Sequence, residues 1–370
     1  MKRDQFRDFD NLFSAHKVLR HSNRVELLSE GKVPSPVCVR LAISDYRPVQ
    51  MDFEGERNGM FDSQNAKAGT VDHNPRRFIE TDRAIALIDN MAEMGVKAVE
   101  LTGGGDPAAH PDHLAICKHV LERNLDLSFV TTGVGLTGGV EDVLAKASGV
   151  RVLLDCSRPS AYATLHGCRE TDFSAAMDSL RLIASARRRA LRDGADENDV
   201  TVLGIECPMH DGINELHEMK SLLQMAYGAG VDYVLLVRRA AWPAAQAVDV
   251  MNRLERVLLD LSVPAGLALI DRVMKTRSRP PRGFCGYQYL APYIGADLNV
   301  YRCPRMAYSE GGLLGSVAEQ SFIEFWQSSE AALELREFDA LSKCFICPYA
   351  AENALLACES KEHNPLGNFL

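Results

Sequence analysis

Apolar segments of strand length alternate with amphipathic segments of helical length through most of this 370-residue chain. The apolar segments carry Val, Ile and Leu on consecutive positions, as strands do when both faces of a parallel sheet are covered. Predicted strands lie at 36–43, 97–102, 125–132, 150–155, 200–207 and 231–237, and predicted helices at 82–95, 113–124, 140–147, 173–193, 213–230 and 245–261. Parallel strands need long crossover connections, so the pattern predicts an α/β fold with about six βα units. That number fits a partial barrel or a doubly wound sheet.

The alternation ends near residue 278, where Cys, Gly, Tyr and Pro become frequent. We therefore expect three parts: an N-terminal helical segment at 1–34, the main α/β domain at 35–277 and a smaller domain at 278–370. Thr81 is expected to cap the helix that begins at residue 82, and Gly95 to end it.

Charge and hydropathy narrow the classes of partner. The chain has a formal net charge of −9 and a pI near 5.6, so it presents no basic field for a nucleic-acid backbone, and we expect no nucleic-acid partner. No segment reaches the roughly 18 uninterrupted apolar residues that a membrane helix needs, and the N-terminus lacks a signal-peptide core. These features predict a cytoplasmic protein without a membrane partner.

The ten cysteines are unevenly distributed. Five are scattered singly, namely Cys38, Cys117, Cys156, Cys168 and Cys207, and five lie in the last quarter of the chain. Of the latter, Cys285 and Cys303 lie on either side of a predicted hairpin, Cys344 and Cys347 form a C-x2-C pair, and Cys358 is interpreted as a buried thiol that could replace a weaker fourth ligand. Without a secretion signal, such thiols are better explained as metal ligands than as disulfides. A closed site of four cysteines fits zinc or an iron–sulfur cluster, and the residues alone leave both open.

Loops that follow strands carry the active site in parallel α/β folds. The second predicted strand ends in "LTGGGDPAAHPD", with Gly103, Gly104, Gly105 and Asp106. Three glycines without Cβ atoms suit either a tight turn or close contact with the amino or carboxylate group of a ligand. His110 and His113 follow the same strand near the start of the next helix, and further polar residues lie at or after the ends of later strands, namely Asp155, Ser157, His166, Cys168, His210, Asp211, Arg238, Arg239 and Trp242.

The segments "GGGDP", "HPD", "VTTGVGL" and "VRVLLDCSRPSAYATLHG" resemble, in order and spacing, the core of the radical S-adenosylmethionine (SAM) superfamily, in the subgroup with a C-terminal SPASM or Twitch domain. The resemblance runs from about Pro36 to Pro348. It implies a partial (βα)6 TIM-like barrel with a C-terminal cysteine-rich Twitch/SPASM-like domain. It also implies SAM binding at Gly103, Gly104, Gly105 and Asp106, and one auxiliary [4Fe–4S] cluster on Cys285, Cys303, Cys344 and Cys347.

The same resemblance exposes a departure. The superfamily carries C-x3-C-x2-C after the first strand, and this frame falls here on Arg47, Met51 and Glu54. Arg has no acceptor atom, and Met and Glu are not thiolates, so this set lacks the ligands that a [4Fe–4S] cluster requires. We expect no SAM-cleaving cluster and weak SAM binding. An Arg–Glu pair with Met51 filling the vacated space is favoured over a new catalytic pair.

Two function classes remain. The first is a pseudoenzyme that binds a peptide or small-molecule ligand at the barrel mouth, or acts as partner subunit of an active radical SAM protein. The second is an enzyme, either with non-radical SAM-dependent chemistry or a radical SAM enzyme whose cluster cysteines were replaced. The sequence favours the first class and leaves the ligand unidentified.

Overall fold

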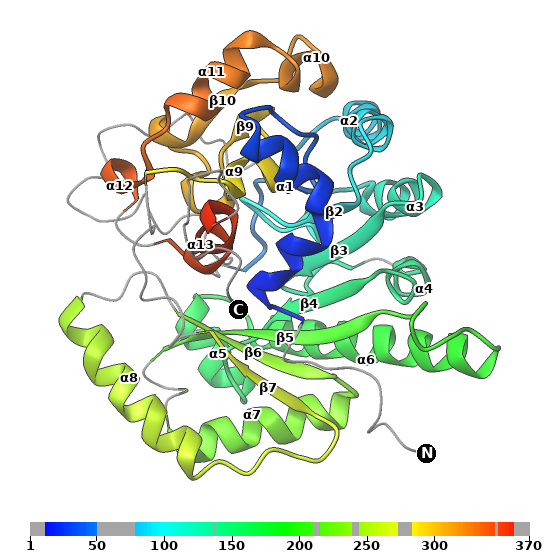
Figure 1. Ribbon diagram of the computed structural model, residues 1–370. Helices are drawn as coiled ribbons and strands as arrows, with labels where there is room; N and C mark the ends of the chain where they lie inside the picture. Colours follow the sequence, from blue (N-terminus) through cyan, green and yellow to red (C-terminus); the bar gives the residue numbers. More distant parts are fainter. Residues whose placement is uncertain are drawn as a thin grey trace.

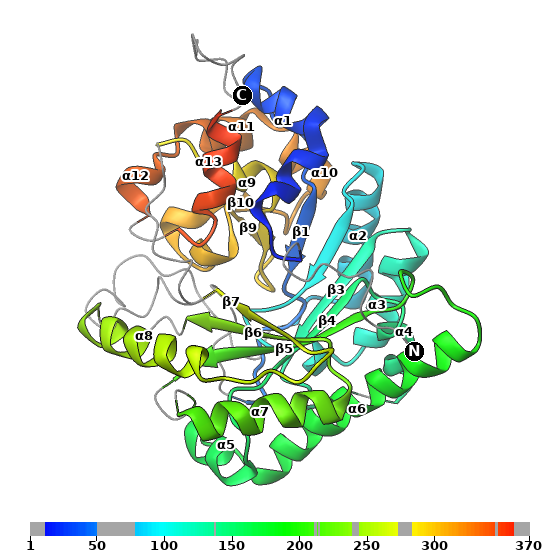
Figure 2. The same cartoon turned by 60° about the horizontal axis from the view of Figure 1, so that its bottom comes forward.

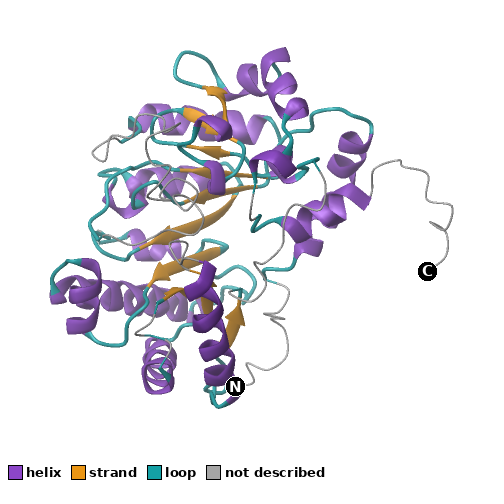
Figure 3. Ribbon diagram, turned by 90° about the vertical axis from the view of Figure 1, so that its left-hand side faces the viewer, coloured by secondary structure: helices purple, strands orange, loops and turns teal. Residues whose placement is uncertain are grey.

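The computed structural model describes residues 12–49, 78–136, 138–210, 213, 215–238, 244–272, 283–344 and 347–358. Within these ranges the chain forms one curved sheet with helices around it, drawn in Figure 1 and, turned by 60°, in Figure 2. Figure 3 shows the strands running through the middle of the molecule with helices at its periphery. The predicted α/β class and its parallel sheet are confirmed.

The sheet has ten strands among the described residues, in the order β10-β9-β8-β1-β2-β3-β4-β5-β6-β7. Neighbours from β1 to β7 are all parallel and follow chain order, as in an opened barrel. The strands are β1 (Cys38–Leu41), β2 (Ala98–Leu101), β3 (Asp126–Thr131), β4 (Gly149–Leu153), β5 (Val202–Met209), β6 (Tyr233–Arg238), β7 (Ala268–Asp271), β8 (Tyr293–Ile294), β9 (Asn299–Tyr301) and β10 (Leu313–Ser316). The parallel run has one strand, β7, more than the six predicted units.

Helices connect the parallel strands and lie along the outer face of the sheet (Figure 2). They are α2 (Thr81–Glu93), α3 (His113–Glu122), α4 (Val140–Leu144), α5 (Pro159–His166), α6 (Glu170–Arg192), α7 (Leu216–Ala229) and α8 (Ala244–Leu259), whereas α1 (Ser22–Ser29) precedes β1. Their apolar stripes form the main core with the strands, as Leu87, Ile88 and Met91 of α2 illustrate.

The ends of α2 show which local signals were interpreted correctly. Gly95 has φ +75°, a conformation that favours glycine, and the helix ends just before it. Thr81 is not the cap: it is the first helical residue, and its hydroxyl donates a hydrogen bond to Asp112 Oδ2 at 2.6 Å. The cap position is Glu80, which makes no side-chain cap bond.

The C-terminal part extends the sheet. β8 pairs in parallel with β1. β9 pairs antiparallel with β8, and β10 pairs antiparallel with β9. The remaining helices of this part are α9 (Tyr287–Leu290), α10 (Phe322–Trp326), α11 (Ser329–Glu337), α12 (Ala340–Lys343) and α13 (Ala350–Cys358). The expected boundary at 277/278 falls among residues that are not described. Strands before it and strands after it belong to the same sheet.

The N-terminal segment packs along β6, because Leu12 and Phe13 lie in one apolar cluster with Tyr233, Leu235 and Val237. The Phe13 ring is 5.6 Å from that of Tyr233, the first residue of β6, and the Arg151 and Arg272 guanidinium carbons lie 5.9 and 5.8 Å from the Phe13 centroid. A 3-10 helix (Ala15–His21) and α1 then lead to β1. Among the described residues, no helix is long and apolar enough to span a membrane.

Four charged side chains, one each from β1, β2, β4 and β5, form a buried network. Glu100 Oε1 lies 2.6 Å from Arg40 Nε, and its Oε2 lies 2.9 Å from Arg151 Nη2. Arg151 also reaches Glu206, with 3.0 Å between Nη1 and Oε2. Arg40 further donates hydrogen bonds to the hydroxyls of Tyr287 and Tyr349, each at 2.9 Å, which ties the network to the C-terminal part.

Candidate functional site

The loops that follow β1 and β2 lie against each other at the carboxyl edge of the sheet. The Gly105 amide donates a hydrogen bond to Ser44 O at 2.9 Å, and the Asp106 amide donates one to Tyr46 O at 2.8 Å. This edge carries the reactive groups of parallel α/β proteins, so the residues in these two loops are first candidates for a site.

The three glycines permit this close approach. A Cβ atom on Gly104 would lie 2.3 Å from Asp45 Oδ1 and 2.4 Å from the Tyr308 hydroxyl. One on Gly105 would lie 2.3 Å from the backbone carbon of Asp45 and from Tyr46 O. Gly104 and Gly105 are therefore required by packing against the β1 loop, whatever ligand they also meet, whereas a Cβ on Gly103 would meet the backbone of Gly105.

Asp106 is fully buried and its carboxylate is held by the protein. Oδ1 accepts hydrogen bonds from the Ala108 amide at 2.9 Å and the Thr131 hydroxyl at 2.7 Å, and Oδ2 accepts from the amide and hydroxyl of Thr132 at 2.8 and 2.5 Å. Burial raises the pKa of Asp106, although these hydrogen bonds act in the opposite direction. The carboxylate thus links the β2 loop to the end of β3.

Arg47, the first of the three positions in the predicted cluster frame, points at the glycine loop. Its Nε–H donates a hydrogen bond to Gly104 O at 2.6 Å, and the side chain is partly buried. The frame's other positions, Met51 and Glu54, lie outside the described residues, so their expected pairing and packing remain predictions.

A residue from the C-terminal part completes the wall of this site. The Tyr308 hydroxyl donates a hydrogen bond to Asp45 Oδ1 at 2.5 Å, and both side chains are buried. Burial, followed by the nearby Tyr293 and Asp45, raises the pKa of Tyr308 well above its ordinary value. Tyr308 therefore remains a neutral donor to the Asp45 carboxylate throughout the physiological range.

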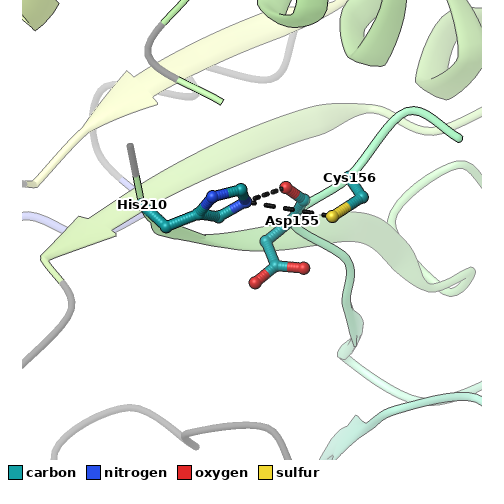
Figure 4. Close-up of side chains that lie close together, drawn as sticks. All are labelled: Asp155, Cys156 and His210. Atoms are coloured by element: carbon teal, nitrogen blue, oxygen red, sulfur yellow. Dashed lines mark hydrogen bonds between the residues drawn. The ribbon is translucent and has the colours of Figure 1, made fainter. Parts of the chain in front are cut away.

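A second group lies at the carboxyl ends of β4 and β5 (Figure 4). His210 Nε2 is 2.7 Å from the backbone oxygen of Asp155 and 3.9 Å from Cys156 Sγ. On the other side of Asp155, His166 Nε2 is 2.8 Å from Oδ1. Burial, followed by the Asp155 carboxylate, raises the pKa of the Cys156 thiol, so this Cys–His pair is not an activated nucleophile.

The four C-terminal cysteines surround one region. The Asn353 amide nitrogen donates to two of their sulfur atoms, those of Cys285 at 3.6 Å and Cys347 at 3.7 Å. Cys303 packs in the same cluster as Cys347. Searched over the described residues, no three of the four sulfur atoms lie within 4.8 Å of one another. The Cys344 thiol contacts Met306 Sδ at 3.8 Å, and the metal-binding role of the four cysteines stays a prediction.

Other predicted residues have structural partners. His110 Nε2 lies 2.8 Å from Ile79 O, and His113 Nδ1 lies 2.7 Å from His110 O, so both tie loops to the helix start. Ser157 donates to Glu218, and Cys168 contacts Arg169 O at 3.7 Å. Asp211, Arg239, Trp242 and the side chain of Arg238 lie outside the described residues.

Comparison with known proteins finds relatives both by sequence and by fold. No protein-family model matches the chain. Over 292 residues, 73% of this chain and 68% of the relative, it is 25% identical to mycofactocin maturase MftC of Mycolicibacterium smegmatis. Over 337 residues, 80% of this chain and 86% of the relative, it is 22% identical to the AdoMet-dependent heme synthase of Methanosarcina barkeri.

Among solved structures, Streptococcus suis SuiB bound to its precursor peptide SuiA matches with a TM-score of 0.59 at 12% identity, covering 92% of this chain and 76% of SuiB. In sequence and in fold, the chain thus resembles members of the radical SAM/SPASM superfamily. At that level of identity the SuiB match shows the shared fold, and the two curated relatives extend the similarity to sequence.

Within the radical SAM/SPASM frame, the sequence identified the β1 and β2 loops but missed two contributions. Tyr308 belongs to a distant segment, and no spacing rule connects it to Asp45. Cys156 seemed to be one of the scattered thiols, yet it directly follows Asp155 at a strand end while His210 follows the next strand. That adjacency at neighbouring strand ends is the signal that could have found the group.

Proposed function

We propose that this chain is a ligand-binding or partner subunit that keeps the radical SAM/SPASM barrel and does not cleave SAM. The observation that carries the proposal is the hydrogen bond from Arg47 Nε to Gly104 O. By resemblance, the first cluster cysteine would stand at position 47, and the glycine loop would receive the amino group of SAM.

Arg47 opposes both roles. A guanidinium is permanently protonated and offers no lone pair to iron. Its N–H donates to a carbonyl of the loop that would receive the ammonium group, at 2.6 Å, and places a second positive charge there. Met51 and Glu54 complete a frame that has no thiol at any of its three positions.

We further propose that Cys285, Cys303, Cys344 and Cys347 bind one auxiliary [4Fe–4S] cluster in a Twitch-like domain. Four thiols fit this group, and the Asn353 amide is placed to donate to two thiolate sulfurs. A single zinc ion held by the same four cysteines is the alternative. When bound, such a cluster supplies a covalent staple and an electron-transfer centre.

The ligand at the barrel mouth is proposed to be a peptide or a small molecule. SuiB, whose fold this chain shares, has been crystallised with its precursor peptide SuiA and with SAM. An active radical SAM protein is the proposed partner, because a subunit that holds a substrate without generating a radical needs another chain to supply the chemistry.

Product analysis tests the proposal. Anaerobically reconstituted protein is incubated with SAM and a strong reductant, and 5′-deoxyadenosine is measured. We expect none above a no-protein control, and about four iron atoms per chain. The triple variant Arg47→Cys, Met51→Cys, Glu54→Cys is expected to gain about four more. Formation of 5′-deoxyadenosine by the parent chain would overturn the proposal and support a radical SAM enzyme with replaced cluster ligands.

A further inference from the structure

Asp155, Cys156 and His210 bring three different metal-ligating groups to one point of the barrel mouth. Over the part of the chain that the structure describes, this is the only set of three whose ligand atoms all lie within 4.8 Å of one another. Asp155 and Cys156 are each 3% exposed, and His210 is partly buried (Figure 4). The set is separate from the four C-terminal cysteines and from the Arg47 loop.

The separation of the donor atoms is close to that of a coordinated ion. A tetrahedral zinc ion with Zn–N and Zn–S bonds of about 2.0 and 2.3 Å holds nitrogen and sulfur about 3.5 Å apart. His210 Nε2 and Cys156 Sγ are 3.9 Å apart without an ion. Metal binding at Nε2 would break its 2.7 Å hydrogen bond to the Asp155 carbonyl oxygen, and the imidazole would turn away from that oxygen.

The surroundings of the group also match a metal site. His166 Nε2 lies 2.8 Å from Asp155 Oδ1, and these two side chains are 3% and 4% exposed. Such a buried partner fixes the orientation of a ligating carboxylate. A thiolate, a carboxylate and a neutral imidazole together carry two negative charges, which balance a divalent cation. This charge balance lowers the free-energy cost of burying the ion in a low-dielectric region.

We propose that Asp155, Cys156 and His210 bind one Zn²⁺ ion. The mixture of sulfur, nitrogen and oxygen donors suits a metal of borderline softness. Three protein ligands leave a fourth position for water or for a ligand group, which is the arrangement of zinc sites that act on bound molecules. The site lies at the strand ends where a barrel-mouth ligand would be held, and His166 is a positioning residue for Asp155.

Metal analysis tests the site in the full-length protein. The four C-terminal cysteines are first filled by anaerobic reconstitution with iron and sulfide, then Zn²⁺ is added, excess is removed and zinc is counted. The parent chain is expected to retain one zinc ion more than Cys156→Ser or His210→Ala. Cys168→Ser, a matched change of a nearby thiol outside the group, is expected to equal the parent. His166→Phe is expected to weaken zinc binding by about 10- to 100-fold.

Cobalt gives an independent reading. Co²⁺ bound at this site should show a sulfur-to-cobalt charge-transfer band that is lost in Cys156→Ser and kept in Cys168→Ser. If Cys156→Ser fails to fold by circular dichroism, His210→Ala decides the outcome. Equal zinc in the parent and in a folded His210→Ala variant, or no zinc in the parent, overturns the proposal. Neither result bears on SAM cleavage, which is tested separately.

Discussion

Gly104 and Gly105 occupy positions where any side chain would meet other atoms of the protein. What each would meet differs: at Gly104 the nearest atoms belong to the side chains of Asp45 and Tyr308, whereas at Gly105 they belong to the backbone of Asp45 and Tyr46. A side chain can shift, but a backbone held by two inter-loop hydrogen bonds cannot shift without breaking them.

Gly105→Ala is therefore expected to destabilise the fold by about 2–3 kcal/mol, because the β1 and β2 loops must separate. The matched control is Gly138→Ala, where a Cβ would meet nothing within 4 Å. We expect the control to stay within about 0.5 kcal/mol of the parent in urea unfolding. Equal stability of the two variants would show that the loops are not in tight contact.

Some residues of the candidate sites could be predicted from the sequence, and others could not. Arg47 was located because a motif with fixed spacing placed it. The group of Asp155, Cys156 and His210 was not predicted, because His210 follows the other two by about 55 positions and meets them only when β4 and β5 pair. Sequence spacing records local geometry, whereas a contact between strand ends depends on the tertiary fold.

Strands β1, β2, β4 and β5 each contribute one charged residue to the buried network. Burial alone would raise the pKa of Glu100, but Arg40 and then Arg151 outweigh it, so its pKa falls from 4.5 to about 2. A carboxyl group whose pKa is depressed on folding stabilises the protein above its unfolded value, and that contribution is lost as the pH falls toward the folded value.

Glu100→Gln is thus expected to lose about 3 kcal/mol of stability at pH 7, because both arginines lose their shared carboxylate. The difference from the parent should shrink as the pH falls from about 4.5 to about 2, where Glu100 itself becomes protonated. Urea unfolding at pH 7 and pH 3 measures it, with the exposed Glu122→Gln as control. A difference that does not change with pH would mean that the carboxylate charge is not what stabilises the network.

The elements themselves followed their sequence patterns closely. Predicted helix 113–124 corresponds to α3, and predicted strand 125–132 to β3, since apolar periodicity and flanking Gly or Asn encode both. β7 was not predicted: its four residues are only partly buried, so its apolar signal is weak. Thr81 was misassigned because a capping sequence and a first-turn residue look alike when the partner, Asp112, is distant.

At the scale of the whole molecule, the C-terminal part is anchored to the barrel at several points. β8 pairs with β1, Arg40 donates to Tyr287 and Tyr349, and Trp326 Nε1 donates to Pro34 O at 2.9 Å. Loss of the proposed cluster should therefore loosen the segments around its ligands without detaching the sheet.

Cys344→Ala is expected to lose the proposed cluster and to be cleaved at least about tenfold faster within 283–358, because ligation is coupled to local folding. Limited proteolysis with mass mapping measures this, and Cys168→Ala, a thiol outside the set, should behave as the parent. We expect fragments from the β1 to β7 region to stay intact. Unchanged iron content together with unchanged cleavage would remove Cys344 from the ligand set.

The pairing of β1 with β8 also has a consequence during synthesis. Arg40 leaves the ribosome about 250 residues before its strand partner Tyr293, which at bacterial or eukaryotic elongation rates corresponds to on the order of 10 to 50 s. Throughout this interval the outer edge of β1 exposes unpaired backbone groups, and such an edge can pair with another nascent chain. A ribosome-associated holding factor, or a slow codon stretch after β7, would therefore affect the yield of this protein more than that of a barrel whose first strand is covered early.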